Sequence, residues 1–419
     1  MVGLHRRTEG MSAERVMILA HGHPDFSLGG GEIAAHGQWA ELRRRGIPTM
    51  FIARVAQGTS PAGAWFSTRS ADGSEMLFNA PHTNNFRHSQ PNLAVVFTEF
   101  RELLERFAPT VVHFHHYVHL GLELVREVRK SAPGAKIVMT LHEYLAICNA
   151  QGQMLKTSGT LCTKAAPLDC HFCFPDVSPQ DFFMRNLFIK SFLNLVDRFI
   201  CPSAFLRDRY VAWGIPSEKM EVLENGQPPD AGEARRVAPS ARMRASFVAL
   251  GQLSARKGTL VLLEAVRLLP KRVRSQMQIE IHGSAQYERA DFLADCAKLC
   301  KGLEDTVRMF GPYRPGDVSD IISRHGWVIT PSIWWENSPL VIQEAFACGR
   351  PVICSNVGGM AEKVRAGIDG LHFRVGSSGD LAAVMERAMS EPGLFEQLCG
   401  GVRQPPSVAQ TIDRLLEVY

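Results

Sequence analysis

The sequence predicts an α/β protein with two Rossmann-like domains that face a central cleft. Short apolar segments alternate with helix-period segments along most of the chain, which is typical of parallel sheets covered by helices. The alternation stops once, over residues 227–240, where proline, alanine and charged residues dominate. A chain of 419 residues is also too long for one ordinary core, so two domains are expected.

The expected strands form two series, one on each side of this break. The first helix is expected over about 32–45, directly after Gly29, Gly30 and Gly31. First-series strands are expected at 16–20, 49–53, 111–114, 136–141 and 198–202, with helices at 99–107 and 122–131. Second-series strands are expected at 247–251, 278–282, 307–310, 327–330 and 351–355.

The two series set the expected domain boundaries. We expect an N-terminal domain over 1–226 with a cysteine-rich insertion at 143–180, a linker over 227–240 and a C-terminal domain over 241–400. Residues 401–419 are expected to form a helix that packs back on the N-terminal domain. The cleft between the carboxyl ends of the two sheets is then the expected ligand site.

The bulk composition, 45% hydrophobic and 21% charged, excludes a fibrous or disordered class. A net charge of +4 suits a nucleotide ligand or an anionic membrane surface, but it is too small for a nucleic-acid partner. No apolar run is long enough to span a membrane, and residues 1–14 lack the apolar segment of a signal peptide. We therefore expect a cytoplasmic protein.

Gly29, Gly30 and Gly31 are the first candidate ligand-binding feature. Glycines between a strand and a helix let the backbone approach a diphosphate, and the helix N-terminus supplies donors and partial positive charge. The alternative is a tight turn without a ligand. The spacing is not G-x-G-x-x-G, which argues against a nicotinamide or flavin site.

The loop from Gly251 to Gly258 is the second candidate, because Arg256 and Lys257 directly precede a helix. Lys257 there could neutralise phosphate charge, although a solvated lysine is the alternative.

The segment from Ser332 to Glu344 is the most specific. Glu336 lies in a turn, the amides near Ser338 and Leu340 lie at a helix start, and Glu344 follows within the helix. Two carboxylates that flank an anion-binding helix start suit a ligand with both hydroxyls and phosphate. The alternative, a capped surface helix, does not explain two tryptophans and a glutamate directly before a proline.

These motifs together resemble glycosyltransferase family 4, of the GT-B architecture. The resemblance rests on the E-x7-E spacing of Glu336 and Glu344, on Lys257-Gly258, on the glycine loop and on Gly358-Gly359. It covers about residues 16–395 and is strongest over 247–375. It implies transfer of a sugar with retention of anomeric configuration and without a cofactor or bound metal; accordingly, the chain contains no D-x-D motif.

The resemblance also implies residue roles. Glu344 would hold the nucleotide ribose, while the segment Asn337, Ser338, Pro339 and Leu340, with Lys257, would hold the diphosphate. Glu336 and His142, as the catalytic candidates, would contact the donor sugar, and Gly30 and Gly31 would close over the diphosphate and the acceptor. One departure matters: Gln252 stands where the family has an arginine. Half of the expected cationic clamp on the diphosphate is therefore missing, unless Arg256 substitutes for that arginine.

The transition state of such a transfer resembles an oxocarbenium ion, and the leaving diphosphate needs its negative charge stabilised. A same-face mechanism, with the leaving phosphate as base, follows from the resemblance alone. Two other functions stay open: a catalytically silent nucleotide-sugar-binding protein and a nonhydrolysing epimerase on the same fold.

Histidines gather after the strands of the N-terminal domain. Strand alternation predicts that His113 and His115 point one way and His116 the other. We favour an acceptor-side or structural role for them, with His119, over a metal site. His21 and His23 are expected to line the cleft.

Four of the ten cysteines cluster in the insertion. Cys170 and Cys173 form a C-x2-C pair, and Cys148 and Cys162 complete a set suited to one structural zinc ion. Buried unpaired thiols and disulfides are the alternatives. The remaining six are expected to pack as small hydrophobic residues: Cys201, Cys296, Cys300, Cys348, Cys354 and Cys399.

The expected partners are a nucleotide-sugar donor and a saccharide or lipid-linked saccharide acceptor, used in cell-surface polysaccharide assembly. Two segments suggest peripheral contact with the inner face of a membrane: Arg43 to Arg45 next to Trp39, and the aromatic and basic stretch 182–199. The alternatives are a solvated helix end and a core helix.

Overall fold

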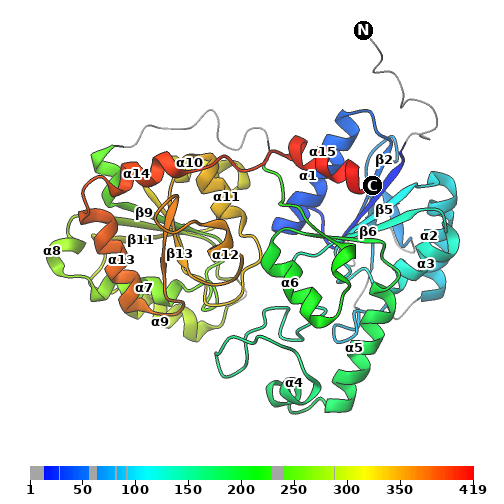
Figure 1. Cartoon of the computed structure of the whole chain (residues 1–419), viewed down its shortest axis with the longest axis horizontal. Helices are drawn as coiled ribbons and strands as arrows, with labels where there is room; N and C mark the ends of the chain where they lie inside the picture. Colours follow the sequence, from blue (N-terminus) through cyan, green and yellow to red (C-terminus); the bar gives the residue numbers. More distant parts are fainter. Residues whose placement is uncertain are drawn as a thin grey trace, which may run out of the picture.

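A computed structural model shows two α/β domains side by side, each built on its own sheet (Figure 1). It describes residues 14–27, 29–55, 64–80, 83–90, 93–228, 240–286 and 288–419. Most of the expected linker, and nearly all of the N-terminal segment 1–14 that we expect not to be a signal peptide, lie outside these residues.

The N-terminal domain contains an eight-stranded sheet in the order β3-β4-β2-β1-β5-β6-β7-β8. All neighbouring strands are parallel except β3 and β4. The strands are β1 Val16–Ala20, β2 Thr49–Arg54, β3 Phe66–Thr68, β4 Glu75–Phe78, β5 Val111–His115, β6 Lys136–Thr140, β7 Arg198–Cys201 and β8 Met220–Val222. The helices are α1 Gly30–Arg44, α2 Leu93–Phe107, α3 Glu123–Ser131, α4 Pro167–Cys173, α5 Pro179–Leu193 and α6 Ala204–Trp213.

The C-terminal domain contains a six-stranded, fully parallel sheet in the order β11-β10-β9-β12-β13-β14. Its strands are β9 Ser246–Leu250, β10 Gln278–His282, β11 Val307–Phe310, β12 Trp327–Thr330, β13 Val352–Ser355 and β14 Gly370–Phe373. Its helices are α7 Thr259–Leu268, α8 Lys271–Arg274, α9 Ala290–Cys300, α10 Val318–Ser323, α11 Leu340–Ala347, α12 Gly358–Lys363, α13 Ser378–Ser390 and α14 Leu394–Gly401.

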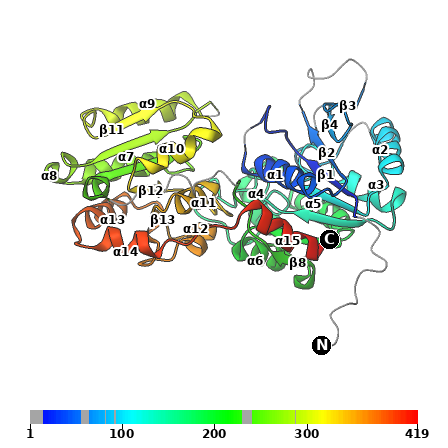
Figure 2. The ribbon, with the colours of Figure 1, turned by 90° about the horizontal axis from the view of Figure 1, so that it is seen from above.

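Helices cover both faces of each sheet, as the view from above shows (Figure 2). In the N-terminal domain, α2, α3, α5 and α6 bury one face, while α1 buries the other. In the C-terminal domain, α7, α9, α13 and α14 cover one face and α10, α11 and α12 the other. This layered arrangement confirms the predicted fold class.

The last helix, α15 (Val408–Val418), returns to the N-terminal domain and lies beside α1 (Figure 1). Its Ile412 and Leu415 are fully buried in the same cluster as Val16 and Leu42. The hydroxyl of the terminal Tyr419 lies 2.7 Å from Nδ1 of His113 in β5. The C-terminus is therefore part of the N-terminal core.

The structure differs from the expected elements in two ways. The first helix begins at Gly30, so two of the three glycines are its first residues and not a preceding loop. Four short strands, β3, β4, β8 and β14, have no counterpart among the expected ones, and each lies at or next to the edge of its sheet. No described helix combines the length and apolar character needed to cross a bilayer.

Candidate active site

A cavity of about 590 Å³ lies between the two domains. The N-terminal domain contributes the start of α1 to its wall, and the C-terminal domain contributes the loops that follow its strands. Its described lining residues are Gly29, Gly30, Ile33, Leu250, Gly251, Gln252, Lys257, Gly283, Ser284, Gln286, Pro312, Tyr313, Pro315, Val318, Ser338, Pro339, Leu340, Val341 and Glu344.

Two helix N-termini meet at this cavity. A Cβ atom at Gly30, the first residue of α1, would lie 3.2 Å from Cδ1 of Leu340, the first residue of α11. The first amides of a helix have no partner within the helix, and they carry partial positive charge. The buried hydroxyl of Ser338, which also lines the cavity, has no hydrogen-bond partner among the described residues. The arrangement suits a diphosphate held between the domains.

Glu336 is buried beside this cavity and accepts three hydrogen bonds at one carboxylate oxygen. Its Oε1 lies 2.6 Å from Nζ of Lys257, 2.7 Å from Oγ of Ser332 and 3.0 Å from Nε1 of Trp334. Lys257 lines the cavity as well, so its ammonium group joins this carboxylate to the wall of the cavity. With one oxygen saturated, the other carboxylate oxygen is left to accept from a sugar hydroxyl.

Two glycines allow the backbone to form this corner. Gly258 has φ +75°, and a Cβ there would lie 1.9 Å from the carbonyl oxygen of Pro331. A Cβ at Gly359 would lie 1.4 Å from the carbonyl oxygen of Asn337. Any larger residue would therefore displace the loop that carries Glu336. The Lys-Gly and Gly-Gly signals in the sequence reflect these two close approaches.

Glu344 projects from α11 into the cavity without a hydrogen-bond partner among the described side chains. Burial raises the pKa of this carboxyl to about 7. Tyr313 lies on the same wall, where burial, and then the charge of Glu344, raises the pKa of its phenol to about 12. A carboxylate without protein partners is suited to accept hydrogen bonds from ribose hydroxyls.

His142 belongs to the N-terminal domain and lies two residues beyond the end of β6. A Cβ at Gly31 would lie 3.4 Å from its ring, so the imidazole packs against the start of α1. Its Nε2 lies 3.4 Å from Nδ1 of His115. Burial, and then the charge of His21, lowers the pKa of His142 to about 3. The imidazole is therefore neutral and can exchange hydrogen bonds with sugar hydroxyls.

The structure places Asn337 and Arg256 at the domain interface. The Asn337 amide accepts from Oγ of Ser203 at 2.6 Å and donates to the carbonyl of His142 at 3.2 Å. Arg256 donates to the amide oxygens of Gln151 and Gln153, both at 3.0 Å, and does not line the cavity. In this structure Arg256 therefore does not take the place of the cation missing at position 252, and its contact with the nucleotide-sugar stays a prediction. Gln252 itself lines the cavity.

The histidines that end β5 have partners within the protein. The rings of His113 and His115 lie 4.3 Å apart, on one face as predicted. His113 bonds to Thr140 and to Tyr419, and His115 bonds to Gln38. His116 follows the end of β5 with φ +142°, so strand alternation does not govern its direction. Its Nε2 lies 3.0 Å from Glu143.

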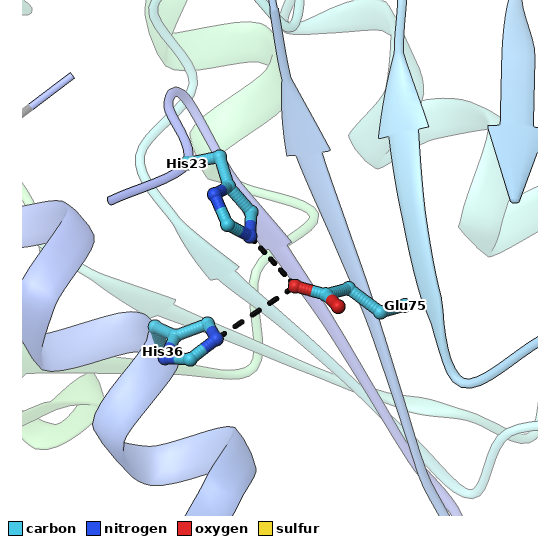
Figure 3. Close-up of side chains that lie close together, drawn as sticks. All are labelled: His23, His36 and Glu75. Atoms are coloured by element: carbon cyan, nitrogen blue, oxygen red, sulfur yellow. Dashed lines mark hydrogen bonds and ion pairs between the residues drawn. The ribbon is translucent and has the colours of Figure 1, made fainter. Parts of the chain in front are cut away.

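Among the described residues, one group of three has ligand atoms close enough for a metal: His23, His36 and Glu75 (Figure 3). Nδ1 of His23 accepts the backbone N–H of Asp25, so its proton lies on Nε2, which donates to Glu75 over 2.6 Å. A metal ion at this nitrogen would have to displace the proton and break the bond to Glu75. His23 thus stabilises the α1 side of the domain and does not line the cavity between the domains.

The four clustered cysteines line one small cavity, so they lie near one another as expected. Nevertheless, in the part of the chain that the structure describes, no three of their sulfur atoms lie close enough together to hold one metal ion. All ten cysteines are free thiols. A zinc ion is therefore not supported, because the thiols share a cavity without forming a closed tetrahedral set. Of the other six, Cys201, Cys296, Cys348 and Cys354 are buried, and Cys300 and Cys399 are half-buried.

Two family models together match nearly the whole chain. Glycosyltransferase Family 4 matches residues 28–230, and Glycosyl transferases group 1 matches residues 230–399. The chain belongs to glycosyltransferase family 4. This confirms the resemblance inferred from the motifs, and enzymes of family 4 generally act without a metal ion.

Individual relatives of this family 4 member are distant. The chain is 33% identical to D-inositol 3-phosphate glycosyltransferase of Actinosynnema mirum over 204 residues, which cover 46% of this chain and 48% of the relative. The chain thus spans about half the length of the curated relatives it matches.

Solved structures match over nearly the whole family 4 chain. Sucrose-phosphate synthase from Thermosynechococcus elongatus matches with a TM-score of 0.71 and 18% identity, over 97% of this chain and 99% of that one. Anabaena Alr3699/HepE in complex with UDP matches with a TM-score of 0.68 and 17% identity, over 96% and 99%. At these identities the likeness shows the fold alone.

Sequence reasoning missed Tyr313 and Ser203 in this family 4 member. Tyr313 follows β11, and the rule that ligands bind beyond the carboxyl ends of parallel strands would have found it. Ser203 follows β7 and bonds to Asn337 of the other domain. No local signal indicates that contact, because it exists only after the domains meet.

Proposed function

We propose that this protein transfers a hexosyl group from a nucleoside-diphosphate sugar to an acceptor hydroxyl, with retention of configuration. One observation carries the proposal: the N-termini of α1 and α11 meet at a cavity that also holds an unpartnered carboxylate, Glu344. The donor's diphosphate would lie at the helix starts and its ribose at Glu344. Family membership and the UDP in the Anabaena structure support a uridine donor as the first to test.

The chemistry follows from charge. Cleavage of the sugar–phosphate bond leaves a nucleoside diphosphate whose developing charge must be stabilised. Lys257 and the amides of α11 would stabilise it without metal, and Glu336 and His142 would hold hydroxyls of the donor sugar. In this same-face reaction the leaving phosphate oxygen takes the proton of the acceptor hydroxyl, and the new glycosidic bond forms on the face that phosphate leaves.

The acceptor we propose is a saccharide, free or lipid-linked, used in cell-surface polysaccharide assembly on the cytoplasmic side. The basic residues that suggested membrane contact are engaged within the protein: Arg43 with Asp72, Arg45 with Asp413, and Arg185 with three backbone carbonyls. Support for contact therefore comes from exposed apolar side chains of α4 and α5, namely Leu168, Phe172, Phe183, Met184 and Leu187. Sedimentation with anionic liposomes tests it, and a protein that stays in the supernatant at low salt has no such contact.

The test of the proposed function is a thermal-shift screen with UDP-, GDP- and ADP-sugars, followed by detection of the released nucleoside diphosphate. One nucleotide class should raise the melting temperature in proportion to the logarithm of its excess over the dissociation constant, and its sugar should be hydrolysed or transferred. Binding without turnover would indicate a silent binding protein, consistent with the neutral Gln252. Interconversion of the sugar without transfer would indicate an epimerase.

A further inference from the structure

Arg54 is a half-buried cation without an acidic partner. It is the last residue of β2, at the carboxyl edge of the N-terminal sheet. One guanidinium nitrogen donates to the carbonyl of Ala80 at 3.3 Å, while its Nε is buried and has no hydrogen-bond partner. No carboxylate among the described residues lies within ion-pair distance of it. The segment that follows, 56–63, contains no Asp or Glu in its sequence.

The carboxylates of the same region have partners of their own. Glu75 accepts from His23 at 2.6 Å and lies 3.6 Å from Nε of Arg69, next to His36 (Figure 3). Glu32 accepts from Ser27 at 2.7 Å, and Glu143 lies 3.0 Å from His116. Arg69, by contrast, is a paired arginine of this region, because it lies near Glu75 and also bonds to Asp25. Arg54 has no such arrangement.

Arg54 is also close to the reaction site. Ala20 of β1 and Ala53 of β2 are register partners in the sheet, so His21 and Arg54 follow them side by side at its carboxyl edge. Burial, chiefly, lowers the pKa of His21, and the positive charge of Arg54 contributes to that decrease. A Cβ at Gly31 would lie 3.3 Å from His21 and 3.4 Å from His142. Arg54 therefore lies at the same edge of the sheet as His21, which approaches the start of α1 beside His142.

An arginine keeps its charge in proteins, and taking that charge partly out of water without a partner costs free energy. Its planar fork matches two oxygens of a phosphate or carboxylate. Such a cation is explained when a ligand supplies the missing anion. Arg54 belongs to the N-terminal domain and is not among the residues that line the cavity proposed for the donor, so the ligand it would hold is the acceptor.

We propose that Arg54 binds an oxyanion, a phosphate or a carboxylate, carried by the acceptor. This inference rests on the proposed function and adds the chemical class of the acceptor. Arg54 holds the anion at the edge of β2 so that the attacking hydroxyl lies between His21 and the donor sugar. Neutral saccharides then lack the contact that places them.

The test measures binding to the UDP-saturated protein of four probes: inorganic phosphate, glucose 6-phosphate, glucuronate and glucose, at equal ionic strength. Wild type should bind at least one anionic probe and not glucose, and phosphate and carboxylate probes identify the kind of anion. R54Q should weaken that binding at least tenfold, and R54K by a smaller factor because it keeps the charge and loses the fork. R308Q, which removes an exposed arginine of β11, should leave it unchanged.

Two further readouts separate this role from others. R54Q should bind UDP as wild type does, and without anion it should melt no lower than wild type, because it removes an unpaired charge. A lower melting temperature or failure to fold would mark Arg54 as structural and overturn the proposal. Equal binding of every anion by wild type and R54Q would overturn it as well. Absence of UDP binding in both proteins would instead contradict the proposed function, whatever the result at Arg54.

Discussion

Glu344→Gln is the sharpest test of the donor site, because this carboxylate lies in the cavity without a protein partner. If ribose hydroxyls donate to it, the substitution removes hydrogen bonds to a charged group, which contribute about 1.5–3 kcal/mol. The affinity for UDP should therefore fall about 10- to 150-fold. Isothermal titration at pH 8 measures it, with Glu304→Gln, an exposed glutamate of the same domain, as the matched control.

The pH dependence of the same variant gives an independent check. Burial raises the pKa of Glu344 to about 7, and the ionised form binds ribose, so wild-type affinity should rise with pH. At pH 6 only about one tenth of the carboxylates are ionised, so the ratio of wild-type to E344Q affinity should fall about tenfold between pH 8 and pH 6. Using this ratio cancels the ionisation of UDP itself.

As the pH rises, the free energy of unfolding of the ligand-free protein should change in the opposite sense to its affinity for UDP. A carboxyl whose folded pKa rises from 4.5 to about 7 favours the unfolded, ionised chain, and a shift of this size corresponds to about 3 kcal/mol. The penalty grows as the pH rises through this window, so ligand-free E344Q should be no less stable than wild type at pH 8. An unchanged affinity for UDP, or an affinity ratio independent of pH, would refute the assignment of Glu344.

Three more outcomes follow from the site. Lys257→Met should lower turnover about 100- to 1000-fold in a nucleotide-release assay, the usual effect of removing one donor to developing charge, with a smaller effect on UDP affinity; equal turnover would place Lys257 outside the chemistry. Gly258→Ala should lower the melting temperature far more than Gly376→Ala. Both glycines have positive φ, but only at Gly258 would the added methyl meet another atom, the carbonyl oxygen of Pro331 at 1.9 Å. Similar losses in the two variants would mean that only the backbone conformation matters, at a cost of about 1–2 kcal/mol. Arg256→Gln should change the affinity for UDP by no more than about twofold, because Arg256 bonds to Gln151 and Gln153. A tenfold loss of affinity on titration would show that Arg256 does contact the diphosphate.

The core strands were predictable because their signal is local. Apolar runs such as Val16–Ala20 and Trp327–Thr330 are buried on both faces of a parallel sheet, so their composition alone identifies them. Edge strands such as Phe66–Thr68 lack that composition and form through pairing with a neighbour. The glycines at the start of α1 were misplaced because local propensity disfavours glycine in a helix, whereas the approach of Leu340 requires it there.

By itself, the sequence determined the two-domain α/β fold, the family, and the segment that carries Glu336 and Glu344, because these features depend on residue type and spacing within short stretches. Only the tertiary structure decided which partners those side chains have. It paired Lys257 with Glu336 and drew Arg256 toward the insertion. It placed the four cysteines around one cavity without a closed metal site, and it left Arg54 without a counter-charge among the described residues. Each of these outcomes depends on residues far apart in the chain, whose contacts exist only once the two sheets are packed and the domains meet.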